Sequence, residues 1–293
     1  MRIKISLFFS VLVVMAFSLS AENCFPADKP VVYFGIGMRF HPITMYERYQ
    51  PIMDYLTQNT PYRFELKISR DYQETIRALV ERQTGVTAPG DGAAMEAMLL
   101  HGAVPILKPL NDEGKPFYRC YFIVPVDSPL RSLSDLKGKK VAFGSKHSTS
   151  GNLIPRYMLE QKGVKIKDLG SITNLRNHST VAREVLKGEY DAGAIRDSVA
   201  DNFLKDGLRI LAASDELPSI PLIVRKDAPR ELTAAIRAAL LKLDRTNPGH
   251  QKLMSSWANE FKNGFVPATA ADYRDLTRKF KAIPYGCGTG CHK

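Results

Sequence analysis

The stretch VAFGSKHSTSGNLIPRYML, residues 141–159, passes from a strand-like segment into a helix-like one. Three consecutive hydroxyl residues, Ser148, Thr149 and Ser150, stand at the junction and are followed by Gly151. A helix N-terminus carries unpaired backbone N–H groups and the positive end of the helix dipole, so it attracts anions. The stretch therefore predicts a strand–loop–helix unit that holds either an ordinary helix cap or an anion site.

The residue types at this junction suit an oxyanion. Hydroxyl groups donate hydrogen bonds, and Gly151 lets the backbone approach a ligand closely. Pro155 lacks an N–H, so we expect the helix to start late or to bend near its start. In the alternative interpretation one serine is an N-cap and the other hydroxyl residues face solvent.

Strand-like and helix-like segments alternate along the chain from about residue 30. Repeated β–α units with short connections favour an α/β fold with mainly parallel sheets. Two apolar strands, CYFIVPVD (120–127) and PLIVRKD (221–227), are each followed by charged residues and are candidate crossings between two lobes. We expect residues 28–120 and 225–285 to form a discontinuous first lobe, and residues 121–224 to form the second.

The N-terminal residues have the pattern of a secretory signal peptide. Arg2 and Lys4 precede an apolar run that ends at Phe17, and small residues follow. This pattern predicts a cleaved signal at residues 1–21 and a periplasmic protein. The alternative is a membrane anchor, for which the apolar run is short.

The formal net charge of the chain is +11. Its cations are scattered among acidic residues and turns, and no basic stripe with interleaved aromatic residues is present, which argues against nucleic acid as a partner. A basic balance is typical of a protein that handles small anions.

Five stretches carry a family resemblance that covers nearly the whole predicted mature chain. They are YFGIG with RYQPIMDYL, GDGAAMEAM with GAVPIL, LSDLKGKKVAFGSKHSTSGNLIPRYML, NHSTVAREVLKGEYDAGAI and SIPLIVRKDAPRELTAAIRAALLKLD. The chain resembles the phosphate, phosphite and phosphonate periplasmic binding proteins of ABC transporters, the PhnD-like family. The order of residues in 133–159 is the most specific part of the resemblance.

The resemblance implies a two-lobed type II periplasmic binding protein fold with a ligand cleft between the lobes. Such a protein closes on a phosphorus oxyanion, delivers it to an ABC permease or a sensor partner in the inner membrane, and is a monomer and not an enzyme. The resemblance assigns Ser148, Thr149, Ser150 and Gly151 to the oxyanion. It also aligns His178 with a histidine of the family.

Other candidate site residues have plainer alternatives. In the alternative interpretation His178 is a surface or capping histidine in a loop. After the strand DAGAI, Arg196 can pair with an anion and Asp197 can accept from a protonated oxygen or an amine, or both are solvated loop charges.

The first lobe departs from the family pattern. Relatives usually place an aromatic residue before a glycine where this chain has Pro89-Gly90-Asp91. We therefore expect no aromatic wall at this position and a ligand with little organic tail. Asp91, and Arg39 in a second loop that faces the cleft, are candidate ligand contacts.

The tail, residues 286–293, raises a second hypothesis. Cys287, Cys291 and His292 form a C-x₃-C-H arrangement, close to the C-x-x-C-H of c-type haem attachment. The interpretations are covalent haem with His292 as axial ligand, a Cys287–Cys291 disulfide, and a metal site completed by His292. With haem the chain would be a periplasmic redox or anion-sensing protein on the same scaffold. Together with Cys24 and Cys120 the two tail cysteines allow three pairings, and the sequence does not choose among them.

Overall fold

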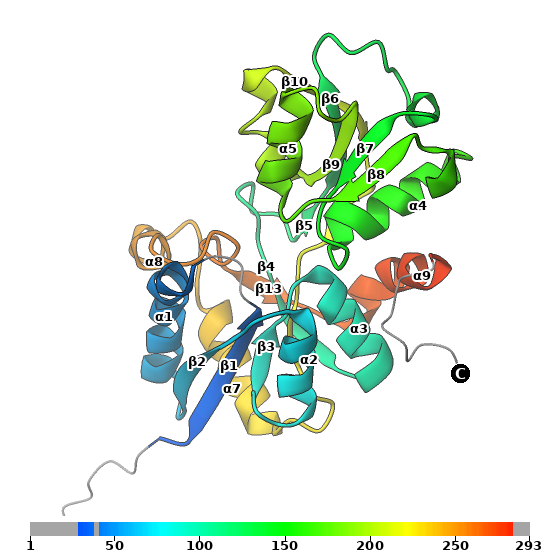
Figure 1. Cartoon of the computed structure of the whole chain (residues 1–293). Coiled ribbons are helices and arrows are strands. Elements are labelled where there is room, and N and C mark those ends of the chain that lie inside the picture. Colours follow the sequence, from blue (N-terminus) through cyan, green and yellow to red (C-terminus); the bar gives the residue numbers. More distant parts are fainter. Residues whose placement is uncertain (1–28, 38–40, 284–293) are drawn as a thin grey trace, which may run out of the picture.

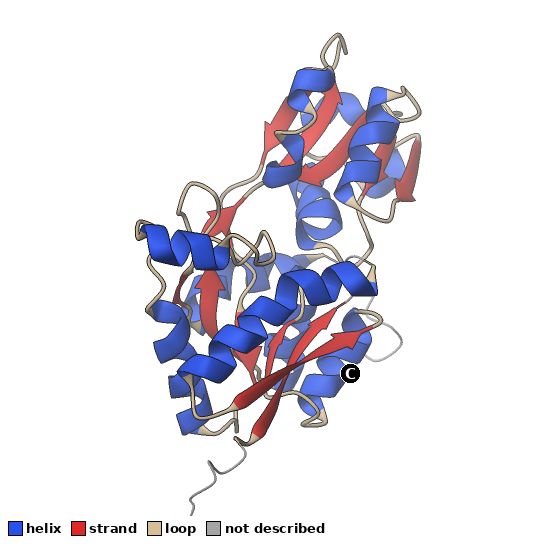
Figure 2. Ribbon diagram, turned by 90° about the vertical axis from the view of Figure 1, so that its left-hand side faces the viewer, coloured by secondary structure: helices blue, strands red, loops and turns tan. Residues whose placement is uncertain are grey.

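The structure, a computed structural model, describes residues 29–37 and 41–283, and these fold into two α/β lobes (Figure 1). Lobe 1 is built on a sheet with the strand order β13-β4-β12-β3-β1-β2, and lobe 2 on a sheet with the order β10-β6-β9-β7-β8. Helices pack against both sheets (Figure 2). The prediction of a two-lobed α/β chain is confirmed.

Lobe 1 begins with β–α units whose strands are parallel, because each connecting helix returns the chain to the same end of the sheet. Asp71 caps the second helix by accepting a hydrogen bond from the backbone N–H of Glu74, and Gly102 ends the third in the left-handed conformation. The elements are β1 (Val31–Gly37), α1 (Pro42–Asn59), β2 (Arg63–Ser69), α2 (Tyr72–Val80), β3 (Val86–Ala88) and α3 (Asp91–His101).

Later segments complete the sheet of lobe 1 with antiparallel strands. β12 pairs with β3 and β4, and β13 pairs with β4. These elements are β4 (Val104–Pro109), β12 (Leu222–Val224), α7 (Arg230–Leu241), α8 (Pro248–Met254), β13 (Phe265–Pro267), η5 (Ala270–Tyr273) and α9 (Arg274–Ala282).

Lobe 2 has β7 parallel to β8 and β9, and antiparallel pairs that join β6 to β9 and to β10. Neighbouring residues of β6 point to opposite faces, and both faces are covered by apolar clusters: Phe122 packs into one and Ile123 into the other. The elements are β6 (Cys120–Pro125), η1 (Leu133–Leu136), β7 (Lys140–Phe143), η2 (Thr149–Leu153), α4 (Ile154–Gln161), η3 (Ile166–Asp168), β8 (Ser171–Asn174), α5 (His178–Leu186), β9 (Ala192–Arg196), α6 (Asp197–Ala200), η4 (Leu204–Asp206) and β10 (Leu208–Ala213).

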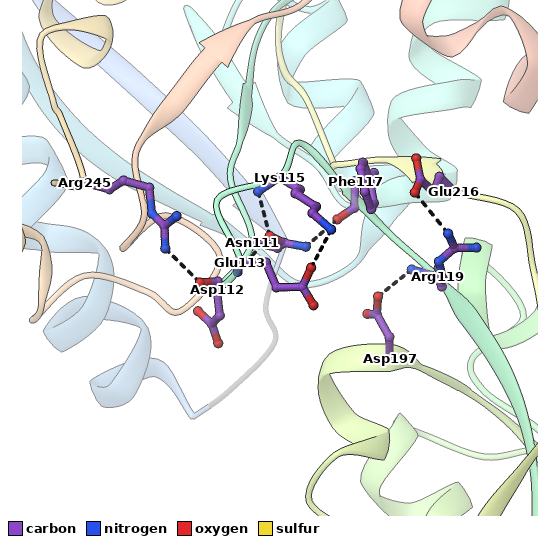
Figure 3. Close-up of polar contacts among 9 residues, drawn as sticks. All are labelled: Asn111, Asp112, Glu113, Lys115, Phe117, Arg119, Asp197, Glu216 and Arg245. Carbon is purple, nitrogen blue, oxygen red and sulfur yellow. Dashed lines mark hydrogen bonds and ion pairs between the residues drawn. The ribbon is translucent and has the colours of Figure 1, made fainter.

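Two short strands, β5 (Phe117–Tyr118) and β11 (Leu217–Pro218), pair where the chain crosses between the lobes. Arg119 fastens this crossing (Figure 3). Its guanidinium donates to the carbonyl of Ser214 at 2.9 Å and to the carboxylate of Glu216 at 3.0 Å, so it ties one crossing segment to the other. Its backbone N–H donates to the carboxylate of Asp197 at 2.6 Å.

A buried apolar cluster joins the lobes beside the crossing. It contains Met95 of α3, Ile154 of α4, Tyr118 of β5 and Phe280 of α9, so lobe 1, lobe 2 and the crossing all contribute side chains. Each large apolar side chain buried there stabilises the packing by roughly 1.5–3 kcal/mol. The cluster therefore sets how the two lobes meet on this side of the molecule.

Three details differ from the sequence prediction. Parallel pairing is limited to β1–β2–β3 and β7–β8–β9, and the strands next to the crossings are antiparallel, so the sheets are mixed. Residues 222–224 form β12 in the sheet of lobe 1, whereas the predicted boundary assigned them to lobe 2. The short strands β3 and β13 have no clear sequence signal, because three residues carry too little periodicity.

The crossing yields a prediction. Arg119→Ala removes two hydrogen bonds that join the crossing segments, so we expect the free energy of unfolding in urea to fall by about 1–2 kcal/mol. The matched control is Arg70→Ala, which removes an exposed ion pair with Glu74, four residues along the chain in lobe 1. We expect the control to unfold at the wild-type midpoint. Equal midpoints for the control and the Arg119 variant would contradict the prediction.

Candidate functional site

The carboxyl ends of the parallel strands of both sheets meet at the junction of the lobes. Tyr72 comes after β2 in lobe 1, and His147 comes after β7 in lobe 2. The centroids of their two rings lie 5.9 Å apart at an interplanar angle of 43°. Ligands of α/β proteins bind outside the carboxyl ends of strands, so this is the place to look for a site.

The hydroxyl run forms a π-helical turn and not the first turn of an ordinary helix. Residues Thr149–Leu153 make up η2, and α4 follows from Ile154 with Pro155 in its first turn. The N–H of Leu153 donates to the carbonyl of Ser148 at 3.0 Å, which is the wide spacing of a π-turn. The expectation that Pro155 delays or bends the helix start is confirmed.

The three hydroxyl residues have different surroundings. Ser148 is a helix cap, because its Oγ accepts a hydrogen bond from the N–H of Gly151 at 3.0 Å. Thr149 is fully buried, and its Oγ1 has no hydrogen-bond partner among the described residues. Ser150 is buried as well. The capping interpretation therefore holds for Ser148 only, and Thr149 presents a buried hydroxyl that a ligand can use.

Side-chain amides clamp the loop that leads into the turn. Asn152 donates to the carbonyl of Lys146 at 2.8 Å and accepts from Arg156 at 2.8 Å and from Asn174 at 3.0 Å. Asn174 also donates to the carbonyl of Gly144 at 2.7 Å. The turn is thus fixed by the protein's own groups before any ligand arrives. Sequence reasoning missed Asn152, Asn174 and Arg156, because nothing local marks an amide that bonds across a loop.

His178, the first residue of α5, lies directly beside the turn. A Cβ placed on Gly151 would come within 2.9 Å of its Cε1 atom and within 3.0 Å of Cα of Gly144, so only glycine fits there. Nδ1 of His178 is buried and has no hydrogen-bond partner among the described residues. Burial, and then the charge of Arg196, lower the pKa of His178 to about 4. The ring is therefore neutral at neutral pH; because Nε2 donates to the backbone carbonyl of Ala194, Nδ1 carries no proton and is an acceptor.

Arg196 ends β9, and Asp197 follows as the first residue of α6. Nε of Arg196 is buried and lacks a hydrogen-bond partner among the described residues. Both carboxylate oxygens of Asp197 accept backbone hydrogen bonds, one from Arg119 at 2.6 Å and one from Ser198 at 2.7 Å. Asp197 therefore takes part in the crossing (Figure 3), and its role as a ligand contact stays a prediction, because each carboxylate oxygen can accept a further hydrogen bond. Burial raises the pKa of its carboxyl group.

An aromatic ring covers the lobe 1 side after all. Tyr72, the first residue of α2, packs on Gly90, where a Cβ would lie 2.6 Å from the ring. Gly90 has a positive φ of 91°, which favours glycine. The expectation of no aromatic wall beside Pro89-Gly90 is thus wrong, because the ring comes from another segment of the chain. A single sequence gives no signal for that contact.

The remaining candidates are placed as follows. Asp91 is the first residue of α3, at the carboxyl end of β3. Arg39, Cys24, Cys287, Cys291 and His292 lie outside the described residues, so the haem, disulfide and metal interpretations of the tail stay predictions. Cys120 is a buried free thiol whose pKa is raised by burial. The described part of the chain holds no group of His, Cys, Asp and Glu side chains suited to a metal ion.

Five buried side-chain polar atoms lack a hydrogen-bond partner among the described residues, and four of them lie at the carboxyl edges of the two sheets. Thr149 Oγ1, His178 Nδ1 and Arg196 Nε follow strands of lobe 2, and Ser69 Oγ ends β2 of lobe 1. Each such atom costs about 1–3 kcal/mol when it stays unpaired. This arrangement can hold a small ligand that is rich in acceptors.

The amide clamp yields a prediction. Asn152→Leu keeps the volume of the side chain and removes its three hydrogen bonds, so the free energy of unfolding should fall by about 2–4 kcal/mol in urea denaturation. Asn202→Leu is the matched control at an exposed position, and we expect no more than about 0.5 kcal/mol there. A loss at Asn152 no larger than the control's would refute the clamp.

His178 yields a pH prediction. Its pKa in the folded protein, about 4, lies below the ordinary value of 6.5, so the unfolded chain binds the proton first. Its contribution to stability is complete above pH 6.5 and is lost as the pH falls toward 4. One pKa unit corresponds to about 1.4 kcal/mol, so the loss reaches on the order of 3–4 kcal/mol. Unfolding titrations of wild type and His178→Asn should differ in slope within this window, and parallel curves would contradict the assignment.

Comparison with known proteins finds a family model and several relatives that are similar to this chain. The family model described as "ABC transporter, phosphonate, periplasmic substrate-binding protein" matches residues 34–273. The probable ABC transporter phosphite binding protein PhnD1 of Prochlorococcus marinus (strain MIT 9301) is 27% identical over 177 residues, which span 54% of this chain and 59% of that protein. The phosphonates-binding periplasmic protein of Escherichia coli (strain K12) is 24% identical over 238 residues, 77% of this chain and 70% of that protein.

Solved structures agree on the fold. The Prochlorococcus marinus PhnD1 structure in complex with methylphosphonate has a TM-score of 0.70 at 19% identity, and covers 87% of this chain and 98% of that one. A Xanthomonas citri protein bound to ATP has a TM-score of 0.73 at 21% identity, and covers 86% of this chain and 97% of that one. The type II periplasmic binding protein fold is confirmed. Within the described residues no helix is long and apolar enough to span a membrane.

Proposed function

Since the chain belongs to the phosphonate periplasmic substrate-binding protein family of ABC transporters, we propose that it is exported and captures a phosphorus oxyanion. The ligand class is phosphate, phosphite or a small phosphonate. The protein delivers the ligand to an ABC permease in the inner membrane and catalyses no reaction.

The observation that carries the proposal is the convergence of donors that lack partners. The hydroxyl of Thr149 and Nε–H of Arg196 are buried donors without acceptors among the described residues, and Nδ1 of His178 beside them is a buried acceptor. A phosphoryl group offers several acceptor oxygens on one tetrahedral centre, so it can pair with donors that approach from different elements. An amine ligand would leave these donors unpaired.

The position of the π-turn supports the same class of ligand. The first residues of the turn follow the capping residue Ser148, so the helix N-terminus and its dipole add positive potential at the hydroxyl run. Two curated relatives are named for phosphite and phosphonates, which agrees with this chemistry.

Isothermal titration calorimetry on the mature protein tests the proposal, with phosphate, phosphite, methylphosphonate and sulfate as separate ligands. We expect binding to at least one phosphorus oxyanion, with Kd in the micromolar range or below, and weaker binding of sulfate. A folded protein that binds none of the three phosphorus ligands would overturn the proposal.

A single-atom substitution tests the site. Thr149→Val replaces the buried hydroxyl by a methyl group of similar shape, so we expect the affinity for the best phosphorus ligand to fall about 10-fold, which corresponds to about 1.4 kcal/mol. Thermal stability without ligand should hold or rise, because an unpaired buried hydroxyl is removed. Thr233→Val on α7 of lobe 1 is the matched control and should bind like wild type. Unchanged affinity in Thr149→Val would remove this residue from the site.

A further inference from the structure

We propose that Arg196 makes the site selective for doubly charged oxyanions, by holding at the carboxyl end of β9 a guanidinium whose Nε–H has no hydrogen-bond partner among the described residues. The inference rests on the proposed function and adds to it the charge state of the ligand. Arg196 is not part of the hydroxyl run and lies on a different element, so it forms a separate determinant.

The guanidinium of Arg196 is held in place by an aromatic ring. Its Cζ atom lies 4.1 Å from the ring centroid of Tyr118, within cation–π distance. Tyr118 is fully buried and belongs to the same apolar cluster as Leu153, the last residue of the π-turn. The cation and the hydroxyl run are therefore fixed relative to each other by packing.

Stacking on a ring does not satisfy the N–H donors of a guanidinium. Nε of Arg196 is buried and has no hydrogen-bond partner among the described residues. Oδ1 of Asp197 lies 3.9 Å from Nε, which makes a long ion pair but is beyond hydrogen-bond distance. Asp197 uses its two oxygens on the backbone N–H groups of Arg119 and Ser198. Arg196 thus keeps a donor for an acceptor that arrives with the ligand.

The other polar groups of the site contribute little formal charge. His178 is neutral at neutral pH, since its pKa is lowered to about 4, and Thr149 is uncharged. Of these three residues Arg196 is the cation. Its Coulomb attraction for a dianion is twice that for a monoanion at the same distance, and burial strengthens the difference. Neutral donors contribute binding free energies that differ far less between a dianion and a monoanion.

Methylphosphonate and methanesulfonate provide a matched pair of probes. They share a tetrahedral head and a methyl group, and at mildly alkaline pH the first is a dianion and the second a monoanion. We expect wild type to bind methylphosphonate at least 100-fold more tightly by calorimetry. In the Arg196→Gln variant the affinity for methylphosphonate should fall at least 10-fold, and the affinity for methanesulfonate should fall less. The ratio of the two affinities should therefore decrease.

Arg183→Gln is the control, because it removes an exposed arginine from α5 of the same lobe. It should keep the wild-type ratio, which separates a local contact from a change in net charge. If the glutamine variant does not fold, as judged by its thermal melt, Arg196→Met makes the same comparison with an apolar chain on the Tyr118 ring.

The outcomes separate the two hypotheses. A wild type that binds no phosphorus oxyanion overturns the proposed function and this inference with it. A wild type that binds methylphosphonate, together with a charge-neutral Arg196 variant that keeps the full preference over methanesulfonate, overturns the inference alone. A narrowed ratio in the variant and an unchanged ratio in Arg183→Gln support it.

Discussion

The site depends on one local constraint, the amide clamp that holds the π-turn after β7. Asn152 and Asn174 satisfy the carbonyls of Lys146 and Gly144, so the loop needs no ligand to keep its shape. Ser148 is likewise committed to the N–H of Gly151. Because the protein's own groups fix the backbone here, the donors that remain are free to face a ligand. Such preorganisation lowers the ordering cost of binding.

The crossing between the lobes extends this arrangement. Arg119 and Asp197 exchange hydrogen bonds, since the N–H of each donates to an oxygen of the other. Arg196 directly precedes Asp197 in the sequence. Its guanidinium stacks on the ring of Tyr118, which directly precedes Arg119 in the sequence. Under the proposed function, a ligand bound by Arg196 would also contact the crossing between the lobes. Closure of the lobes on a ligand requires contacts that are stronger in the closed state, and a contact at Arg196 would act at the crossing.

How much the sequence predicts follows from the range of each interaction. The hydroxyl run, the delayed helix start at Pro155 and the cap at Asp71 depend on neighbouring residues, and local patterns predict them. The approach of His178 to Gly151 came from a family resemblance, since the two residues are distant in sequence. Tyr72 on Gly90 and Arg119 on Asp197 are contacts between distant segments. Only the fold shows that Asp197 accepts backbone hydrogen bonds at the crossing, because a carboxylate after a strand has the same local sequence pattern whether it faces a ligand or a backbone N–H.

The unpaired donors explain why such a site is selective. An unpaired buried donor costs about 1–3 kcal/mol, and the protein carries several at the two carboxyl edges. A ligand recovers that cost only if it brings an acceptor to each donor, so a smaller or less charged anion recovers less. Binding to the folded state alone also stabilises it by mass action. These groups could have had hydrogen-bond partners within the protein, as Ser148 has. Because they have none among the described residues, they lower the stability of the fold and remain available to a ligand.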